Sequence, residues 1–438
     1  MWNGGALGGS VWLSVFPGAG GDRIVVVKSW VEVSERRLTA NYRLLAKTAG
    51  ASTSVLAVVK ADAYGHGAEV CAPVLARAGA EWLGVTDVAE GVTVRATGLE
   101  RQPRILVMCG LLAEDADAVV RHSLTPVVWN RQQMEWLAEA VARCGASPLA
   151  VHLEIDTGMA RQGVVVGEEM RALLGWLRGQ RSLVLDGVMT HFASAEVAGS
   201  AQTLAQQERF EAAMREVADA GLRPAWVHAG NSSTVDNNSG VDNNSAVDNN
   251  ADPASSLVWL RRLAADCGAR AMVRSGLGLY GYCLPIEDAN GAAVLEAAQV
   301  RPGLLPVMTW KARVIGLRDV LAGDTVGYNA IFVARRGMRL ALVPVGYADG
   351  LRRELSGSNV LAGGWMMVRG RRAAIVGRVS MNLTVVDVSE IADVAVGDEV
   401  VVLGDGITAE DHARLARTIA YEIVCGVRAA SQLVTTMD

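Results

Sequence analysis

Eight short apolar runs alternate with segments of helical periodicity between residues 54 and 275, and this alternation constrains the fold more than any other feature. The apolar runs are 55–60, 82–86, 104–109, 125–129, 150–155, 184–190, 225–229 and 271–274. Helical segments between them include 68–80, 131–144, 168–178, 201–220 and 255–267. Regular alternation of this kind indicates βαβ units and a parallel sheet. Eight units in roughly 220 residues match the size of a (β/α)8 barrel.

A doubly wound α/β sheet is the alternative arrangement of the same elements. It would need fewer strands, or a phosphate-binding G-x-G-x-x-G turn after the first strand. The first apolar run is followed by KADAYGHG instead. The pattern therefore favours the barrel.

The pattern changes after about residue 300, where short strands separated by turn residues replace the alternation. The expected strands are 307–317, 338–345, 364–369, 372–379, 383–388 and 398–403, with one helix near 409–418. We therefore predict an α/β protein in which a (β/α)8 barrel in residues 25–300 is followed by a β-rich C-terminal domain in residues 301–438.

Two further segments fall outside this plan. Residues 1–24 are apolar and glycine-rich and are predicted to form a flexible N-terminal extension. The motifs VDNNSG, VDNNSA and VDNNAD follow one another across residues 235–252. A polar six-residue repeat has nothing to bury, so it predicts a disordered insert within the barrel.

The composition limits the classes of partner. Hydrophobic residues make up 51% and charged residues 20% of the 438 residues, so a large core can form. The net charge is −5 with the cations spread along the chain, which predicts no binding to nucleic acid. No apolar stretch is long enough to predict a membrane span. The six cysteines form no C-x-x-C pair, which indicates reduced cytoplasmic thiols and no metal site.

Reactive side chains follow the predicted strands at their carboxyl ends, where barrel enzymes carry their active sites. The first of them is Lys60, which closes a very apolar strand. The others are Tyr64, Glu154, Arg161, His191, His228, Asn231, Ser232, Arg274 and Gly276. Each has an ordinary explanation on its own, since a strand-end lysine often reaches water and a strand-end arginine is usually a salt-bridge partner. Their convergence on one predicted rim indicates a binding site.

The residue types at this rim point to a particular cofactor. Ser232, Tyr64 and the backbone N–H groups near Gly276 follow the strands whose loops often hold a phosphate in barrel enzymes. A lysine across from a phosphate site indicates covalent attachment of pyridoxal phosphate. We therefore predict a pyridoxal-phosphate site anchored on Lys60.

Nine segments resemble the alanine racemase family in sequence and in order. They are AVVKADAYGHG, DTGMARQG, THFASAE, HAGNSS, RSGLGLYG, GDTVGYNA, PVGYADG, VGRVSMN and IAYEI. The resemblance runs from about Trp30 to the C-terminus. It implies a barrel followed by a β domain, a homodimer with shared active sites, and a two-base pyridoxal-phosphate reaction. That reaction interconverts L-alanine and D-alanine in the cytoplasm and supplies D-alanine for peptidoglycan.

The resemblance also implies a role for individual residues. Lys60 is expected to hold the cofactor and to act as one base, and Tyr328 is expected to be the opposite base in the partner subunit's site. The other implied cofactor-binding residues are Tyr64, His191, His228, Asn231, Ser232, Arg274, Gly276, Leu277 and Tyr421. Among these, Arg274 is expected to face the pyridine nitrogen with support from His228, and His191 to stack on the ring. The implied substrate-binding residues are Arg161, Met381 and Tyr347, supported by Glu154 and Asn382.

Four positions depart from the commonest family pattern: Asp62 replaces an asparagine, Ser275 a proline, Asn382 an aspartate and Glu154 a lysine. In many family members that lysine is carbamylated and orients the arginine that matches Arg161. We expect Glu154 to supply this anion itself and to bind Arg161.

Asn382 removes a charge near the expected substrate carboxylate, which leaves the choice of substrate open. A broader-specificity amino-acid racemase or a serine racemase is the nearest alternative function. A barrel-type pyridoxal-phosphate decarboxylase is another, although its glycine-rich phosphate segment and catalytic cysteine are not evident. A non-catalytic pyridoxal-phosphate-binding protein is more remote, because the β domain carrying Tyr328 argues against a barrel alone.

Overall fold

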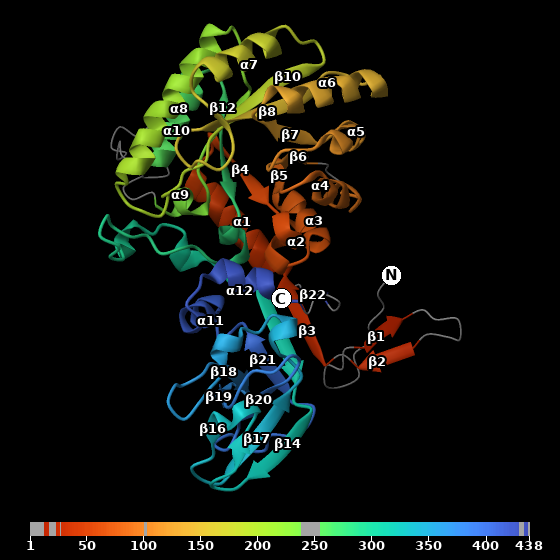
Figure 1. Ribbon diagram of the computed structural model, residues 1–438, viewed down its shortest axis with the longest axis vertical. Coiled ribbons are helices and arrows are strands. Elements are labelled where there is room, and N and C mark those ends of the chain that lie inside the picture. The colour runs from red at the N-terminus through yellow and green to blue at the C-terminus, as the bar shows by residue number, and fades with distance from the viewer. Residues whose placement is uncertain are drawn as a thin grey trace. The chain divides into compact units, whose positions relative to one another are not determined.

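The computed structural model of the chain describes residues 13–16, 23–26, 28–99, 103–237, 255–428 and 433–436. The chain divides into two compact units (Figure 1). The first, here called the barrel unit, comprises Arg37–Tyr64 and Ala68–Leu305. The second, here called the β unit, comprises Met1–Arg36, Gly65–Gly67 and Pro306–Asp438.

Eight parallel strands close into a barrel in the barrel unit. They are β4 (Thr53–Val58), β5 (Trp82–Val85), β6 (Arg104–Val107), β7 (Thr125–Val128), β8 (Leu149–Asp156), β10 (Leu183–Met189), β11 (Trp226–His228) and β12 (Arg270–Ser275). The pairing of β8 with β10 closes the sheet, and the short β9 (Val164–Val165) adds to β8. Each apolar run of the sequence overlaps one of these strands, so the predicted (β/α)8 barrel is confirmed.

Helices cover the outside of the strands (Figure 1). They are α1 (Glu35–Ala49), α3 (Ala68–Ala78), α4 (Val88–Arg95), α5 (Ala116–Arg121), α6 (Arg131–Cys144), α7 (Glu168–Arg178), α8 (Ala201–Asp219), α9 (Ser232–Asp236) and α10 (Ser256–Asp266). In α7 the buried residues Met170, Leu173, Leu174 and Leu177 follow the helical period and face the sheet. Burying one such leucine contributes about 1.5–3 kcal/mol.

The start of α6 shows how the sequence sets a helix boundary. Asn130 accepts a hydrogen bond from the Gln133 N–H, and Gly145 ends the helix in the left-handed conformation at φ 59°. Two neighbouring tryptophans of the barrel strands also pack together: the rings of Trp82 and Trp226, each the first residue of its strand, lie edge to face with 5.6 Å between centroids.

The β unit is built on a nine-stranded sheet in the order β14-β17-β20-β19-β18-β21-β13-β3-β22. The strands are β3 (Ser29–Ser34), β13 (Met308–Arg313), β14 (Gly316–Val320), β17 (Met338–Val343), β18 (Trp365–Val368), β19 (Arg371–Ile375), β20 (Thr384–Asp387), β21 (Glu399–Leu403) and β22 (Leu433–Thr436). All pairs are antiparallel except β22 with β3. The short pair β15 (Thr325–Val326) and β16 (Phe332–Val333) stands apart, and two helices follow, α11 (Ala409–Ala416) and α12 (Ala420–Gly426).

The unit boundaries differ from the expected ones at the start of the chain. The strand β3 pairs with β13 and so belongs to the β unit, although the sequence places it in the barrel. The predicted strand 307–317 is two strands, β13 and β14. Within the predicted N-terminal extension, β1 (Leu13–Phe16) pairs with β2 (Arg23–Val26). The predicted repeat insert lies outside the described residues from position 238 onward.

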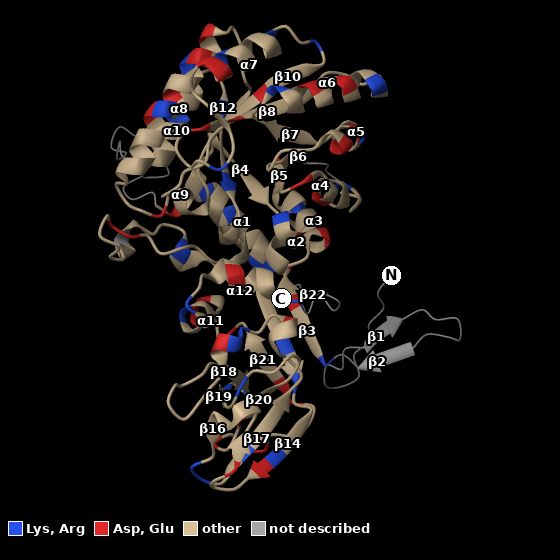
Figure 2. Ribbon diagram, in the orientation of Figure 1, with Lys and Arg blue, Asp and Glu red and all other residues tan. Residues whose placement is uncertain are grey.

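The charge distribution agrees with the sequence. Lys and Arg are interspersed with Asp and Glu over both units, without a large patch of one sign in the view of Figure 2. In the part of the chain that the structure describes, no helix is long and apolar enough to cross a bilayer.

Candidate active site

Lys60 stands at the end of β4 and begins a short left-handed turn, α2 (Lys60–Gly65). The four residues Ala61–Tyr64 have φ values between 52° and 56°, and none of them is glycine. This conformation costs an L-residue roughly 1–2 kcal/mol. A run of four such residues therefore has to be held by its surroundings.

The side chain of Glu90, in the first turn of α4, holds this turn. Its Oε1 accepts a hydrogen bond from the Ala61 N–H at 2.7 Å, and its Oε2 accepts one from the Thr86 N–H at 2.7 Å. Asp62 closes the turn from the other end, because its Oδ1 accepts the Ala68 N–H at 2.7 Å. Glu90 thus fixes the backbone next to Lys60. The sequence reasoning missed it, because a glutamate at this helix position fits a local capping role equally well.

A set of donors converges at the ends of β11 and β12. The buried Ser232 Oγ accepts the N–H groups of Gly276 and Gly278, both at 3.1 Å, and bonds the Ser275 Oγ at 3.0 Å. A Cβ at Gly276 would lie 2.2 Å from the Tyr64 Oη, so only glycine fits beside that hydroxyl. Hydroxyl and backbone N–H groups in this arrangement suit a phosphate. The departure at Ser275 adds a hydroxyl that a proline would lack.

The neighbouring residues of the cradle have structural roles. Asn231 caps α9: its Oδ1 accepts the Thr234 N–H at 3.2 Å, and its own N–H donates to the Thr234 Oγ1 at 3.1 Å. Leu277 is buried, at 1% exposure, and begins the turn after Gly276. Both residues therefore shape the backbone that carries Ser232 and Gly276.

Arg274 is buried at the end of β12 and links two histidines. Its Nη1 donates to the His228 Nδ1 at 3.1 Å, and its Nη2 donates to the His191 Nδ1 at 3.1 Å and to the Thr190 carbonyl at 2.7 Å. Burial lowers the pKa of Arg274 to about 10, so the guanidinium stays charged at neutral pH. Burial, together with the charges of Arg274, Arg161 and Lys60, lowers the pKa of His191 to about 3. His191 is therefore a neutral ring.

Two cations of this rim, Lys60 and Arg161, make no direct bond to a protein side chain among the residues that the structure describes. Both charges act on His191, so they face one common region. The loop that carries Arg161 is ordered by the Asp156 Oδ1, which accepts the N–H groups of Gly158, Met159 and Ala160. Two unpaired cations beside a phosphate cradle indicate a ligand with two separate anionic groups.

Glu154 does not bind Arg161 as the sequence led us to expect. Its side chain points from β8 into the barrel at 2% exposure, and the hydrogen bond to its Oε2 comes from the Gln162 Nε2. Arg161 instead lies in the exposed loop beyond the strand, and no hydrogen bond or ion pair joins its guanidinium to Glu154. Burial raises the pKa of Glu154, while Gln162, Arg274 and Arg161 act in the opposite direction.

The remaining candidate residues lie in the β unit. Tyr328 follows β15 and is 67% exposed. Tyr347 and Met381 are held in adjoining loops, where the Tyr347 N–H donates to the Ser380 carbonyl at 3.0 Å. The Asn382 Nδ2 donates a hydrogen bond to the Asp349 Oδ2 at 3.2 Å. An aspartate at position 382 would instead place a second negative charge next to the Asp349 carboxylate. Tyr421 lies in α12.

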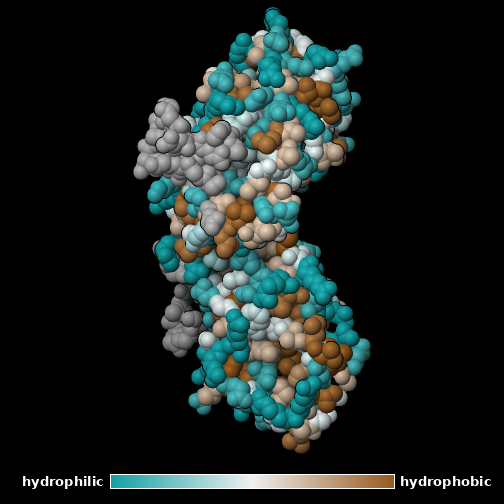
Figure 3. Space-filling view, turned by 90° about the vertical axis from the view of Figure 1, so that its left-hand side faces the viewer, coloured by the Kyte–Doolittle hydropathy of each residue, from teal (hydrophilic) through white to brown (hydrophobic). Residues whose placement is uncertain are grey.

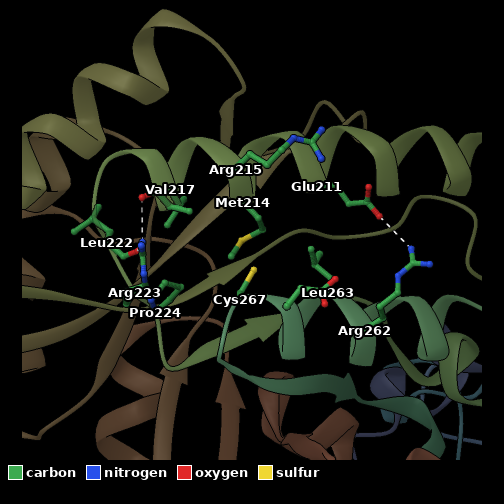
Figure 4. Close-up of a pocket in the computed structure, with 12 residues that line it drawn as sticks. Glu211, Met214, Arg215, Val217, Leu222, Arg223, Pro224, Arg262, Leu263 and Cys267 are labelled. Atoms are coloured by element: carbon green, nitrogen blue, oxygen red, sulfur yellow. Dashed lines mark hydrogen bonds and ion pairs between the residues drawn. The ribbon is translucent and has the colours of Figure 1, made fainter. Parts of the chain in front are cut away.

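A cavity of about 520 Å³ lies elsewhere, between α8 and α10 (Figure 4). Met214 and Cys267 face each other across it, and Arg223 and Arg262 stand at its sides. None of the predicted site residues lines it. The chemistry at the strand ends, rather than cavity volume, therefore locates the candidate site.

Fold and site together define a class: a (β/α)8-barrel enzyme with a strand-end lysine, a phosphate cradle and a separate antiparallel β domain. The family model described as "Alanine racemase, N-terminal domain" matches residues 33–244, and the one described as "Alanine racemase, C-terminal domain" matches residues 307–435. The chain belongs to the alanine racemase family.

Individual relatives agree over nearly the whole chain. The alanine racemase of Symbiobacterium thermophilum is 36% identical over 403 residues, covering 91% of this chain and 94% of that protein. The structure of alanine racemase from Streptomyces coelicolor A3(2) matches with a TM-score of 0.79 at 30% identity, covering 94% of this chain and 98% of that one. A structure of the Bartonella henselae alanine racemase with covalently bound pyridoxal phosphate has the same fold, with a TM-score of 0.74 at 24% identity over 94% of this chain and 100% of that one.

Proposed function

We propose that this protein interconverts L-alanine and D-alanine with pyridoxal phosphate as cofactor. The observation that carries the proposal is the pairing of two unpartnered cations, Lys60 and Arg161, with the cradle of Ser232, Gly276 and Gly278. An amino acid bound with this cofactor has the two anionic groups that such a site requires. Relatives named alanine racemase that match nearly the full chain support the same assignment.

The residues present fit pyridoxal phosphate. Lys60 would attach it, and Ser232, Gly276 and Tyr64, with Tyr421, would hold its phosphate. Arg274 would face the pyridine nitrogen, and because a guanidinium donates hydrogen bonds and keeps its proton, that nitrogen would stay unprotonated. When bound, the cofactor withdraws electrons from the amino acid and acidifies its α-hydrogen.

Racemisation requires a base on each face of the substrate, since a proton leaves one face and another arrives on the opposite face. Lys60 would serve one face. Tyr328 of a second copy would serve the other, which makes the active protein a homodimer with shared sites. The exposure of Tyr328, Tyr347 and Met381, at 67%, 45% and 56%, supports a surface that another chain covers. In the view of Figure 3, exposed hydrophobic residues lie among hydrophilic ones on the β unit and on the barrel unit.

Arg161 would bind the substrate carboxylate, with Met381 and Tyr347 beside it. Asn382 favours a second candidate, a racemase of broader specificity, because its amide is engaged with Asp349 and brings no negative charge of its own. A cytoplasmic location and a supply of D-alanine for peptidoglycan complete the proposal. The absence of a disulfide from the described residues is compatible with that location.

A racemisation assay over a panel of single L-amino acids tests the function. With purified protein and added pyridoxal phosphate, we expect alanine to give a kcat/KM at least about tenfold above that of serine, a difference of about 1.4 kcal/mol in transition-state binding. Serine or a basic amino acid turned over as fast as alanine would favour the broader racemase. No turnover of any amino acid by cofactor-loaded protein would contradict the proposal.

Replacing Glu154 with glutamine should raise the KM for alanine several-fold and leave kcat within about twofold, because the substitution keeps the shape and removes an anion that acts on Arg161. Steady-state kinetics measure this. Glu154→Asp, which keeps the charge, is the matched control. Wild-type protein should ignore added bicarbonate, whereas Glu154→Lys should lose activity and regain part of it with bicarbonate. An unchanged KM in the glutamine variant would show that Glu154 has no such effect.

A further inference from the structure

A chain of hydrogen bonds leads away from Arg274 through the interior of the barrel. The Nε2 of His228 lies 2.8 Å from the Nδ1 of His152, and the Nε2 of His152 lies 3.2 Å from the Oδ2 of Asp186. The same Oδ2 accepts a hydrogen bond from the Nη2 of Arg104 at 2.8 Å. Both histidines are fully buried, whereas the Arg104 side chain is 40% exposed. The chain therefore connects the strand-end site with solvent near the start of β6.

The direction of every proton in this chain follows from its first member. A guanidinium can only donate, so the Nδ1 of His228 must accept from Arg274 and its proton sits on Nε2. That proton is donated to the Nδ1 of His152, whose own proton must then sit on Nε2 and point to the Asp186 carboxylate. All donors point from Arg274 toward Asp186, and no member can reverse without breaking a buried hydrogen bond.

The charge states are consistent with this direction. Burial lowers the pKa of His152 and of His228, so both rings stay neutral. Burial acts to raise the pKa of Asp186, but the hydrogen bonds and charges of His152 and Arg104 outweigh it and lower that pKa. The series of hydrogen bonds thus ends on the Asp186 carboxylate, which is ionised at neutral pH.

The fold makes room for this chain. A Cβ at Gly187 would lie 2.6 Å from atoms of the His152 ring, so the residue beside Asp186 has to be glycine. The pairing of β10 with β8 shifts register between Leu185 and Gly187. Arg104 lies over the ring of Trp82 at 4.0 Å, and that ring is 5.2 Å from His152. Packing therefore fixes both ends of the His152–Asp186 contact.

We propose that His152 and Asp186 are positioning residues for Arg274. Of the five N–H groups of its guanidinium, three are engaged by His228, His191 and Thr190. The Asp186 anion polarises the chain and strengthens His228 as the acceptor, which fixes the direction of the two remaining N–H groups. That these two N–H groups serve a cofactor nitrogen rests on the proposed function. The hydrogen-bonded series from Arg274 through His228 and His152 to Asp186, here called the relay, does not depend on the proposed function.

The test combines nuclear magnetic resonance with one substitution. The chain has six histidines, so ¹⁵N-labelled histidine gives few ring signals, which single-histidine substitutions can assign. In the wild-type protein we expect His152 and His228 to be neutral with the proton on Nε2. Asp186→Asn removes the charge, and its side-chain oxygen still accepts from Arg104 and His152. We expect the ring shifts of His228 to move, although His228 does not touch residue 186.

Glu81→Gln is the matched control. Glu81 pairs with Arg270 at 2.9 Å, and Arg270 lies over Trp226 at 4.3 Å, which repeats the Arg104–Asp186–Trp82 arrangement without a histidine contact. In cofactor-loaded protein, Asp186→Asn should lower kcat about tenfold, as loss of an outer-shell partner does at metal sites, with little change in KM. Asp186→Glu, which keeps the charge, should have most of the wild-type kcat, and the kcat of Glu81→Gln should equal that of the wild type.

A proton on the Nδ1 of His228 in the wild-type protein would overturn the relay, and this measurement needs no variant to fold. Unchanged His228 shifts in Asp186→Asn would also overturn it, as would a kcat equal to that of Glu81→Gln. If no amino acid is racemised, the proposed function fails. The ring signals would still decide on the relay.

Discussion

Replacing Lys60 with alanine should lower kcat for alanine racemisation by at least about 10³-fold, because the change removes both the cofactor anchor and one of the two bases. The purified variant should also lose the visible absorbance of bound cofactor. Borohydride reduction of the wild-type protein, followed by digestion and mass spectrometry, should place the reduced cofactor on the peptide that contains Lys60.

The chain contains only four lysines, so mapping the reduced cofactor has to distinguish Lys60 from only three other residues. Lys28 and Lys47 are exposed, and Lys311 is paired with Glu32 and Glu399 at 3.1 and 3.0 Å. Lys47→Ala in α1 is therefore the control and should retain wild-type kinetics. Cofactor found on Lys28, Lys47 or Lys311 would contradict the site.

The barrel could be predicted from sequence because its signal is local. Each strand is a short apolar run bounded by turn residues, and each helix carries its own period. The strand β3 could not be assigned in the same way, since it pairs with β13 some 275 residues further along the chain. The residues of β3 alone do not indicate which distant strand they pair with.

The site was only partly visible in the sequence for a similar reason. Strand ends identify Lys60 and Arg274, but nothing in the letters ADAY predicts four left-handed residues, since none of them is glycine. The spacing of Glu154 and Arg161 was misleading, because one belongs to a strand and the other to an exposed loop. His152 had a signal that was overlooked: with Glu154 it occupies alternate positions of an apolar strand, so both side chains face the barrel interior.

Mixing two inactive proteins should restore activity if each active site is shared between two chains. Lys60→Ala lacks the anchor, and Tyr328→Phe keeps the ring but lacks the hydroxyl of the opposite base. After complete exchange of equal amounts, half of the dimers are mixed, and each mixed dimer has one intact site of two. We therefore expect about one quarter of the activity of the same amount of wild-type protein.

A second mixture separates a shared site from a site within one chain. The double variant Lys60→Ala/Tyr328→Phe is mixed with an equal amount of wild-type protein under the same exchange conditions. If sites are shared, every mixed dimer has both sites broken, so the activity should fall to about half of its value before exchange. If each site lies within one chain, this mixture keeps its activity and the first mixture gains none. Exchange itself is verified with differently tagged chains, so unchanged activity in both mixtures would contradict the role of Tyr328 in its partner's site.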